Sequence, residues 1–354
     1  MAHRWDPRAP GPGPLVRPVP IDPAGAAGPT RRQAAGRYWR RTTPRLYVPA
    51  DITDDQVEQR ILEQSMTLPR DGAVTGWAAC RLHGANFCDG LARDGKSRLP
   101  VPLNVGPRGF LPRNAGARPV FRQLAGDDRA IRFGIPTVTA VRATYDAVLL
   151  ADDETEAVVA IDMMCAAELV SLRMLHAYAD RQRFRRRKFD EALARASEHS
   201  WSPNETRLRR LAETGAKLPE LKVNCDVLDL SGRLLGIADL LDVEAGLVIE
   251  FNGADHRSAL RQTADVRKEE RLRRVGLEVT GVTGMDLREP GRVVRRLVDA
   301  RSRARFESSA TRRWAARPRA DDLHQRLEVA RVLRQQHTTL ADEPVPDIRD
   351  IRGW

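Results

Sequence analysis

The chain has few cysteines and few histidines, which argues against several kinds of site. Its 354 residues include four cysteines, none of them in a CxxC pair, and seven histidines. None of the histidines has metal-finger spacing, so the sequence argues against a structural zinc site. Isolated cysteines are typical of reduced cytosolic thiols rather than of a disulfide framework.

Long apolar runs are also absent. No run of 18 apolar residues occurs, and the first twenty residues, MAHRWDPRAPGPGPLVRPVP, lack the apolar core of a signal peptide. We therefore expect a soluble, cytoplasmic protein with no membrane partner. The apolar fraction of 42% is ordinary for a folded chain, and the length is sufficient for two or three domains.

Positive charge exceeds negative charge. Lysine and arginine number 59 against 48 aspartates and glutamates, a formal net charge of +11. This excess favours an acidic partner such as nucleic acid. An Arg-rich proteome would give the same excess, so composition leaves both explanations open. The run RQRFRRRK at 181–188 fits either a solvated helix edge or a contact with phosphate.

Composition and hydrophobic periodicity divide the chain into four parts. Residues 1–30, rich in Pro, Gly and Ala, predict a disordered leader, and residues 31–199 predict an α+β domain. The expected strands of this domain cover 41–50, 99–105 and 117–124. The expected helices cover 54–65 with Asp54 as cap, 76–85 ending at Gly84, and most of 137–199 with caps at Asp153 and Ser171.

A second domain is expected over residues 200–306. Its first helix, 202–214, has Ser202 as cap and Pro203 in the first helical position. The elements that follow are strands at 221–230, 233–243 and 246–252, a helix at 256–276, a strand at 277–283 and a helix at 290–306. The order α-β-β-β-α-β-α predicts an α/β sandwich on a mixed sheet. Residues 307–354 form a basic and then acidic tail with a predicted helix at 321–336.

The stretch GLVIEFNGADHR, 246–257, places Glu250 inside an apolar strand. A buried, unpaired carboxylate costs several kcal/mol, so such a group is neutralised, paired or bound to a metal. Because side chains alternate along strands, an even-numbered turn centred on Glu244 and Ala245 sets Asp239 directly opposite Glu250. A three-residue bulged loop would shift the pairing by one residue, so this inference depends on the turn.

Two carboxylates on neighbouring strands about 4.8 Å apart can reach one divalent cation. Oxygen ligands suit Mg²⁺ or Mn²⁺, and Asp239 and Glu250 are the expected metal ligands. Such an ion activates water and offsets charge on a phosphodiester in the transition state. Paired acids and basic charge together indicate phosphodiester hydrolysis.

The same residues resemble the restriction-endonuclease-like PD-(D/E)XK superfamily, in its branch related to very-short-patch repair endonucleases. The resemblance covers about residues 200–300, and it includes Ala238-Asp239, Glu250-Phe251-Asn252-Gly253 and His256. The superfamily's lysine two residues after the Glu is replaced by Asn252, and Lys268 is a candidate substitute. The site residues that this resemblance implies are Glu205, Asp239, Glu250, Asn252, His256, Asp265 and Lys268.

Each residue also has a purely structural explanation. Glu205 fits a capping box with Ser202, and His256 could cap a helix. Asp265 and Lys268, three residues apart on one helix face, favour a surface salt bridge. The remaining alternative is a core pair of Asp239 and Glu250 that is tied to Arg267 or Arg271 without a metal.

The first half resembles the antitoxin and transcriptional-regulator family called AbiEi, over about residues 36–198. The segments that carry the resemblance are TGWAACRLHGA (75–85), VPLNV (101–105), FGIPTVTAVRATYD (133–146) and AVVAIDMM (157–164). Members pair a small winged helix with this kind of domain, whereas here the Pro/Gly leader takes the winged helix's place. The resemblance implies a cognate toxin or another protein as partner.

Two functions from different classes follow from these observations. The first is a metal-dependent endonuclease or nickase acting on DNA, expected to be double-stranded, in phage defence, DNA repair or a mobile element. The second is a non-catalytic DNA-binding regulator or antitoxin with a degenerate nuclease fold. Binding of RNA is a third alternative, because Mg²⁺ phosphodiester chemistry does not choose between nucleic acids.

Overall fold

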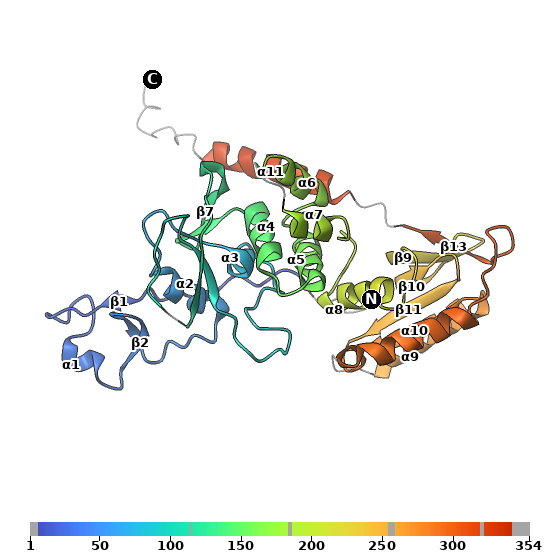
Figure 1. The fold of residues 1–354 in the computed structure, drawn as a ribbon, viewed down its shortest axis with the longest axis horizontal. Coiled ribbons are helices and arrows are strands. Elements are labelled where there is room, and N and C mark those ends of the chain that lie inside the picture. The colour runs from blue at the N-terminus through green and yellow to red at the C-terminus, as the bar shows by residue number, and fades with distance from the viewer. Residues whose placement is uncertain (1–5, 114, 183–185, 254–258, 319–321, 342–354) are drawn as a thin grey trace, which may run out of the picture.

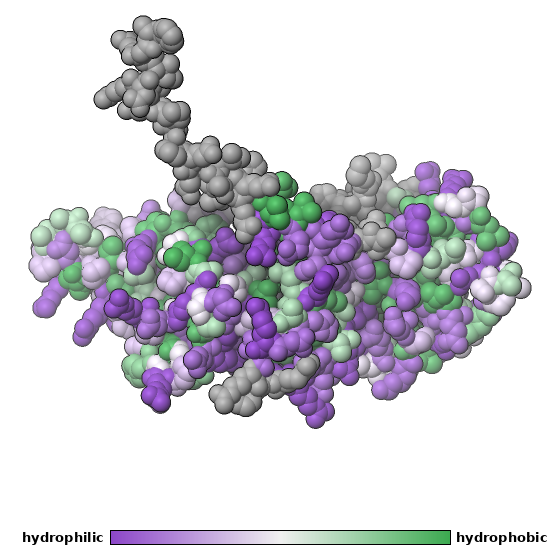
Figure 2. All heavy atoms as spheres, turned by 90° about the horizontal axis from the view of Figure 1, so that it is seen from above, coloured by the Kyte–Doolittle hydropathy of each residue, from purple (hydrophilic) through white to green (hydrophobic). Residues whose placement is uncertain are grey.

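The described residues form a mixed α/β protein with helices and three sheets (Figure 1). The computed structural model describes residues 6–113, 115–182, 186–253, 259–318 and 322–341. We call residues 6–199 the first unit and residues 200–317 the second unit. No described helix combines the length and apolar character needed to cross a bilayer. The face in Figure 2 is mostly hydrophilic, with apolar residues scattered over it.

The first unit contains two sheets with helices packed around one core. The small sheet has the order β1-β3-β2, and the larger one has the order β6-β5-β4-β8-β7. The strands are β1 (Val19–Pro20), β2 (Trp39–Thr43), β3 (Leu46–Pro49), β4 (Ala73–Val74), β5 (Val101–Asn104), β6 (Ala117–Val120), β7 (Arg129–Arg132) and β8 (Ile135–Val138). The helices are α1 (Arg31–Ala34), α2 (Val57–Ser65), α3 (Gly76–Leu82), α4 (Ala140–Leu150), α5 (Glu154–Ala166), α6 (Leu172–Asp180) and α7 (Arg187–Leu193).

Several local predictions for this unit are confirmed. The side chains of Asp153 and Ser171 cap α5 and α6 by accepting backbone N–H bonds. Gly84, with φ of +107°, lies just beyond the end of α3. The cysteines of this unit, Cys80, Cys88 and Cys165, are buried free thiols, as is Cys225 of the second unit.

Three predictions for the first unit are wrong. Residues 6–30 are not a separate disordered leader, because β1 pairs with β3 and Gln59 exchanges two hydrogen bonds with the backbone of Val16. The single strand expected at 41–50 is a hairpin that turns at Arg45, whose φ is +68°. Asp54 does not cap α2, which begins at Val57, since its carboxylate pairs with Arg98 instead.

The second unit has the predicted element order from α8 to α10, and one further strand, β13, follows it. It contains α8 (Pro203–Thr214), β9 (Lys222–Asp229), β10 (Leu234–Asp242), β11 (Leu247–Asn252), α9 (Ala259–Arg274), β12 (Glu278–Thr283), α10 (Pro290–Arg303) and β13 (Trp314–Arg317). The sheet order is β12-β11-β10-β9-β13. Only the β11–β12 pair is parallel among these described strands, so the sheet is mixed, as expected.

Helices cover both faces of this sheet because its strands are apolar on both sides. Leu240 and Ile249 pack toward α8 and α10, in a cluster that includes Leu208 and Leu297. A second cluster of side chains, which includes Leu235 and Ala238, faces α9, whose Leu272 is fully buried. The members of that second cluster include Leu241, Val248, Val279 and Trp314.

The chain after residue 306 is more than a tail. β13 adds an edge strand beside β9 and buries Trp314 in the α9-side cluster. The described part of α11 (Leu323–Ala341) then returns to the first unit and lies beside α6 (Figure 1). Leu323 joins the first unit's core, and Ser171 bonds with His324. The predicted helix at 321–336 is confirmed, whereas the strand before it was not predicted.

Candidate active site

The hairpin of β10 and β11 has the predicted register. Leu240 pairs with Ile249 and Leu241 pairs with Val248, so one further step sets Asp239 opposite Glu250. The four-residue turn 243–246 ends at Gly246, which has a φ of +74° that glycine adopts without strain. This turn excludes the bulged three-residue alternative.

Glu250 lies on the face of the sheet that α9 covers, where Lys268 of that helix contacts it. Val248, two residues before Glu250 on β11, packs in the α9-side cluster. Asp239 Oδ2 accepts a 2.7 Å hydrogen bond from the backbone N–H of Phe251, across the strand pair. Asp239 therefore reaches the residue next to Glu250, and the carboxylates are neighbours.

Lys268 on α9 completes a charged group with these acids. Its Nζ donates to Glu250 Oε2 at 2.6 Å, and both side chains are partly buried. The predicted surface salt bridge with Asp265 is therefore wrong for Lys268. Its side chain crosses β10 at Gly236, where an added Cβ would lie 2.9 Å from Lys268 Cγ. Gly236 leaves the space that the lysine needs.

The alternative of a core pair tied to an arginine is not observed among the described contacts. Arg271 donates from Nε to the backbone carbonyl of Leu235 at 2.9 Å. Arg267 lies on the exposed part of α9. Lysine, rather than arginine, is the cation at Glu250, and it contacts only one of the two carboxylate oxygens.

Burial and mutual repulsion hold these acids toward their neutral forms. Burial and then the charge of Asp239 raise the pKa of Glu250 to about 8, against the opposing effect of Lys268. Burial also raises the pKa of Asp239, opposed by Lys268 and the Phe251 N–H. Glu250 Oε1 is buried and has no hydrogen-bond partner among the described residues. A buried acceptor without a hydrogen bond destabilises the folded protein unless a proton or a cation occupies it.

Glu205 approaches the same place from the start of α8. Its backbone N–H donates to Ser202 Oγ at 3.3 Å, so the predicted cap is present. Its carboxylate accepts from the Trp201 N–H at 2.9 Å and from Asn224 Nδ2 at 2.8 Å. Burial and the charge of Asp239 raise the pKa of Glu205 to about 7. Glu205 thus takes part in the cap of α8 and also lies close enough to Asp239 to feel its charge.

Asn224 is a site residue that the sequence analysis missed. It lies on β9 between Val223 and Cys225, which pair with Leu240 and Ala238, so Asn224 is opposite Asp239 in register. Its φ of +46° is in the left-handed region that asparagine tolerates better than most residues. Its Oδ1 is buried and has no hydrogen-bond partner in the described part of the chain. An asparagine inside the apolar strand KVNCDVLD was the available signal.

The other predicted residues have different positions. Asn252, at the end of β11, lies against Gly281 of β12, the residue that pairs with Glu250. A Cβ added at Gly281 would lie 2.6 Å from Asn252 Nδ2. Asp265 is exposed on α9 and raises the pKa of Asp239 and Glu250 through its charge. His256 lies outside the described residues. Residues 183–185 of the basic run do so as well.

The donor set fits Mg²⁺ or Mn²⁺ in one specific way. The described residues contain no group of three or more His, Cys, Asp or Glu side chains that could hold a metal. Mg²⁺, however, commonly uses one or two carboxylates and keeps several waters. Asp239 and Glu250 supply two carboxylates, and Glu250 Oε1 supplies an unused buried oxygen. These residues can therefore hold a hydrated hard cation but not a fully protein-ligated one.

Sequence relatives add nothing to this geometry. Comparisons of the chain with protein families, with curated proteins and with solved structures find no match.

Proposed function

We propose that the chain is a metal-dependent endonuclease or nickase that hydrolyses phosphodiester bonds in DNA. The observation that carries the proposal is the hairpin register that sets Asp239 opposite Glu250, with Lys268 Nζ 2.6 Å from Glu250. The order of elements from α8 to β12 is that of a PD-(D/E)XK-like sandwich, which supports the same assignment. The net charge of +11 favours a nucleic-acid substrate.

The residues divide the chemical work among them. Asp239 and Glu250 would hold a Mg²⁺ or Mn²⁺ ion, which supplies a Lewis acid for the phosphate and a water of lowered pKa. Lys268 holds a positive charge beside Glu250, where it can offset negative charge that develops on the phosphate. Glu205, with a pKa of about 7, can accept or return a proton near neutral pH.

A plasmid assay tests the proposal directly. Supercoiled plasmid is incubated with the purified chain in Mg²⁺, in Mn²⁺ and in EDTA, and the nicked and linear forms are quantified. Conversion in both metals and none in EDTA is the expected result. Intact plasmid under all three conditions, with a protein that is folded by circular dichroism, would contradict it.

A second candidate is a non-catalytic, DNA-binding regulator or antitoxin, with a cognate toxin or other protein bound through the first unit. Asn252 in place of the superfamily's lysine favours this function, because asparagine supplies no charge. A gel-shift with a defined promoter, combined with no turnover in either metal, would support the regulator and exclude the nuclease.

Metal binding is expected to strengthen as pH rises. The raised pKa of Glu250, about 8, means that a proton competes with the cation strongly at pH 6 and much less at pH 8.5. Saturating Mg²⁺ should raise Tm by about 3 °C or more at pH 8.5 and by about 1 °C or less at pH 6. Differential scanning fluorimetry at the two pH values provides the measurement.

The metal-free protein should show the opposite trend. Because the folded pKa of Glu250 is raised from the ordinary 4.5, its stabilising contribution is complete below pH 4.5 and is lost as pH rises through 8.

Glu250→Gln cannot ionise and should remove the Mg²⁺ response at both pH values. A Glu278→Gln variant on β12 is the matched control and should retain it. Equal Mg²⁺ shifts at pH 6 and 8.5 would count against Glu250 as a ligand.

A further inference from the structure

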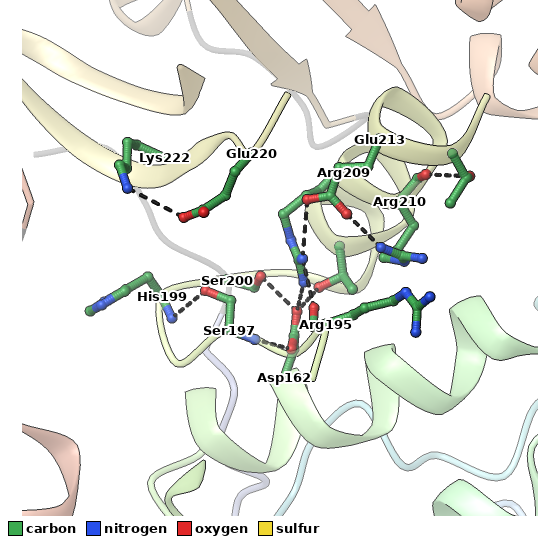
Figure 3. Close-up of polar contacts among 12 residues, drawn as sticks. Asp162, Arg195, Ser197, His199, Ser200, Arg209, Arg210, Glu213, Glu220 and Lys222 are labelled. Atoms are coloured by element: carbon green, nitrogen blue, oxygen red, sulfur yellow. Dashed lines mark hydrogen bonds and ion pairs between the residues drawn. The ribbon is translucent and has the colours of Figure 1, made fainter. Parts of the chain in front are cut away.

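A buried carboxylate of the first unit lies at the junction with the second. Asp162 on α5 is fully buried and accepts four hydrogen bonds (Figure 3). Its Oδ1 accepts from the Ser197 N–H at 2.7 Å. Its Oδ2 accepts from Ser200 Oγ, Thr206 Oγ1 and Arg209 Nη2, each at 2.8 Å. These donors all belong to residues 197–209, so one side chain fastens this segment to α5.

The fastened segment presents two backbone groups to the candidate site. The Trp201 N–H donates to Glu205 Oε2 at 2.9 Å. The His199 carbonyl accepts a 2.7 Å bond from Asn224 Nδ2, which also donates to Glu205 at 2.8 Å. Ser197, Ser200 and Thr206 are therefore anchored to Asp162. His199 and Trp201 lie between these anchored residues, and their backbone groups orient Asn224 and Glu205.

Asp162 is suited to this task because all four of its contacts are donors, and the Arg209 guanidinium opposes the rise in its pKa that burial causes. Hydrogen bonds to an ionised carboxylate are shorter and stronger than neutral ones. Arg209 supplies the compensating charge, and three further donors fix the direction of both oxygens. Removing such an acceptor leaves buried donors without partners, which loosens the segment rather than merely weakening one contact.

We infer that Asp162 of the first unit is a positioning residue for Glu205 and Asn224 in the second. Its role in catalysis rests on the proposed function. The first unit is then a structural component of the nuclease site, and the orientation of Glu205 depends on it. Asp162 does not touch the reacting atoms, because its partners separate it from Glu205.

Other contacts across the same two helices provide a matched control. Glu156 on α5 accepts bonds of 2.7 and 2.9 Å from Arg207 on α8. This pair joins the units as Asp162 does, but it does not contact residues 197–201. Glu156→Gln therefore weakens the junction without releasing the segment that orients Glu205.

The experiment compares full-length Asp162→Asn, Ser200→Ala and Glu156→Gln with the unmodified chain. Selective ¹⁵N labelling of Trp and Asn reports the Trp201 backbone amide and the Asn224 side-chain amide, assigned with Trp201→Phe and Asn224→Ser. Both signals should shift or broaden in Asp162→Asn and in Ser200→Ala but remain in place in Glu156→Gln. In the plasmid assay, kcat should fall about tenfold in Asp162→Asn with KM within about twofold, while Glu156→Gln stays near the unmodified chain.

Each outcome decides the inference. Unchanged amide signals in Ser200→Ala and Asp162→Asn would overturn it, as would equal perturbation by Glu156→Gln. If Asp162→Asn does not fold, Ser200→Ala still decides, because that variant retains the Asp162–Arg209 ion pair. If the unmodified chain does not cleave DNA, the nuclease proposal fails, whereas the amide signals still establish or refute positioning by Asp162.

Discussion

Replacing Glu250 with alanine should reduce Mg²⁺-dependent plasmid cleavage at least about 100-fold, while DNA binding stays within about twofold. The substitution removes one of the two neighbouring carboxylates, together with the buried Oε1 that no described residue contacts by a hydrogen bond. It also leaves Lys268 without its 2.6 Å acceptor. DNA binding should persist because the arginines that can contact phosphate are spread over the surface. Initial rates of nicking and a gel-shift in EDTA measure the two quantities.

The control for this variant lies on the same hairpin. Glu244→Ala removes an exposed acid from the turn between β10 and β11, where it pairs with Arg301. Its cleavage rate should stay within about twofold of the unmodified chain, because surface ion pairs contribute about 1 kcal/mol or less. Cleavage that survives in Glu250→Ala would assign the activity to another site or to a contaminant.

The parts of the fold that depend on local sequence could be predicted. Ser202 and Pro203 begin α8, and the caps at Asp153 and Ser171 begin helices where expected. Gly276, with φ of +98°, follows α9 as predicted. Capping and glycine signals act over a few residues, so one sequence contains them in full.

The missed elements depend on partners distant in sequence. β4 is two residues long, and β13 is four residues long and becomes a strand only by pairing with β9. β1 is likewise defined by its pairing with β3, which the Pro/Gly-rich composition of its surroundings concealed. Short segments carry little periodicity, and pairing across many residues leaves no local pattern.

The same distinction applies to the candidate site. The positions of Asp239 and Glu250 followed from a two-residue period and a turn length, both of which are local. The position of the Lys268 side chain could not be predicted in this way, because it depends on how α9 crosses the sheet and on the space above Gly236. Asn224 was missed because its role depends on α8 approaching β9 through Glu205.

Gly236 thereby becomes a test of Lys268 that leaves the lysine itself unchanged. An added Cβ at Gly236 would lie 2.9 Å from Lys268 Cγ and 3.2 Å from its Cε, closer than carbon atoms normally approach. The obstructed atoms belong to a flexible side chain, so the lysine can move away at little cost. Because a β-branched residue suits a strand, the fold should tolerate valine at this position.

Gly236→Val should therefore lower the cleavage rate about 100-fold, similarly to Lys268→Met, while Mg²⁺ still raises Tm. Displacing the ammonium group from Glu250 removes the positive charge near the phosphate but leaves both carboxylates in place. Leu234→Val, at an exposed position on the same strand, controls for the β-branched side chain and should cleave at the normal rate. The double variant Gly236→Val/Lys268→Met should be no slower than either single variant, because both remove the same interaction. Additive losses in the double variant would show that Gly236 acts on something other than Lys268.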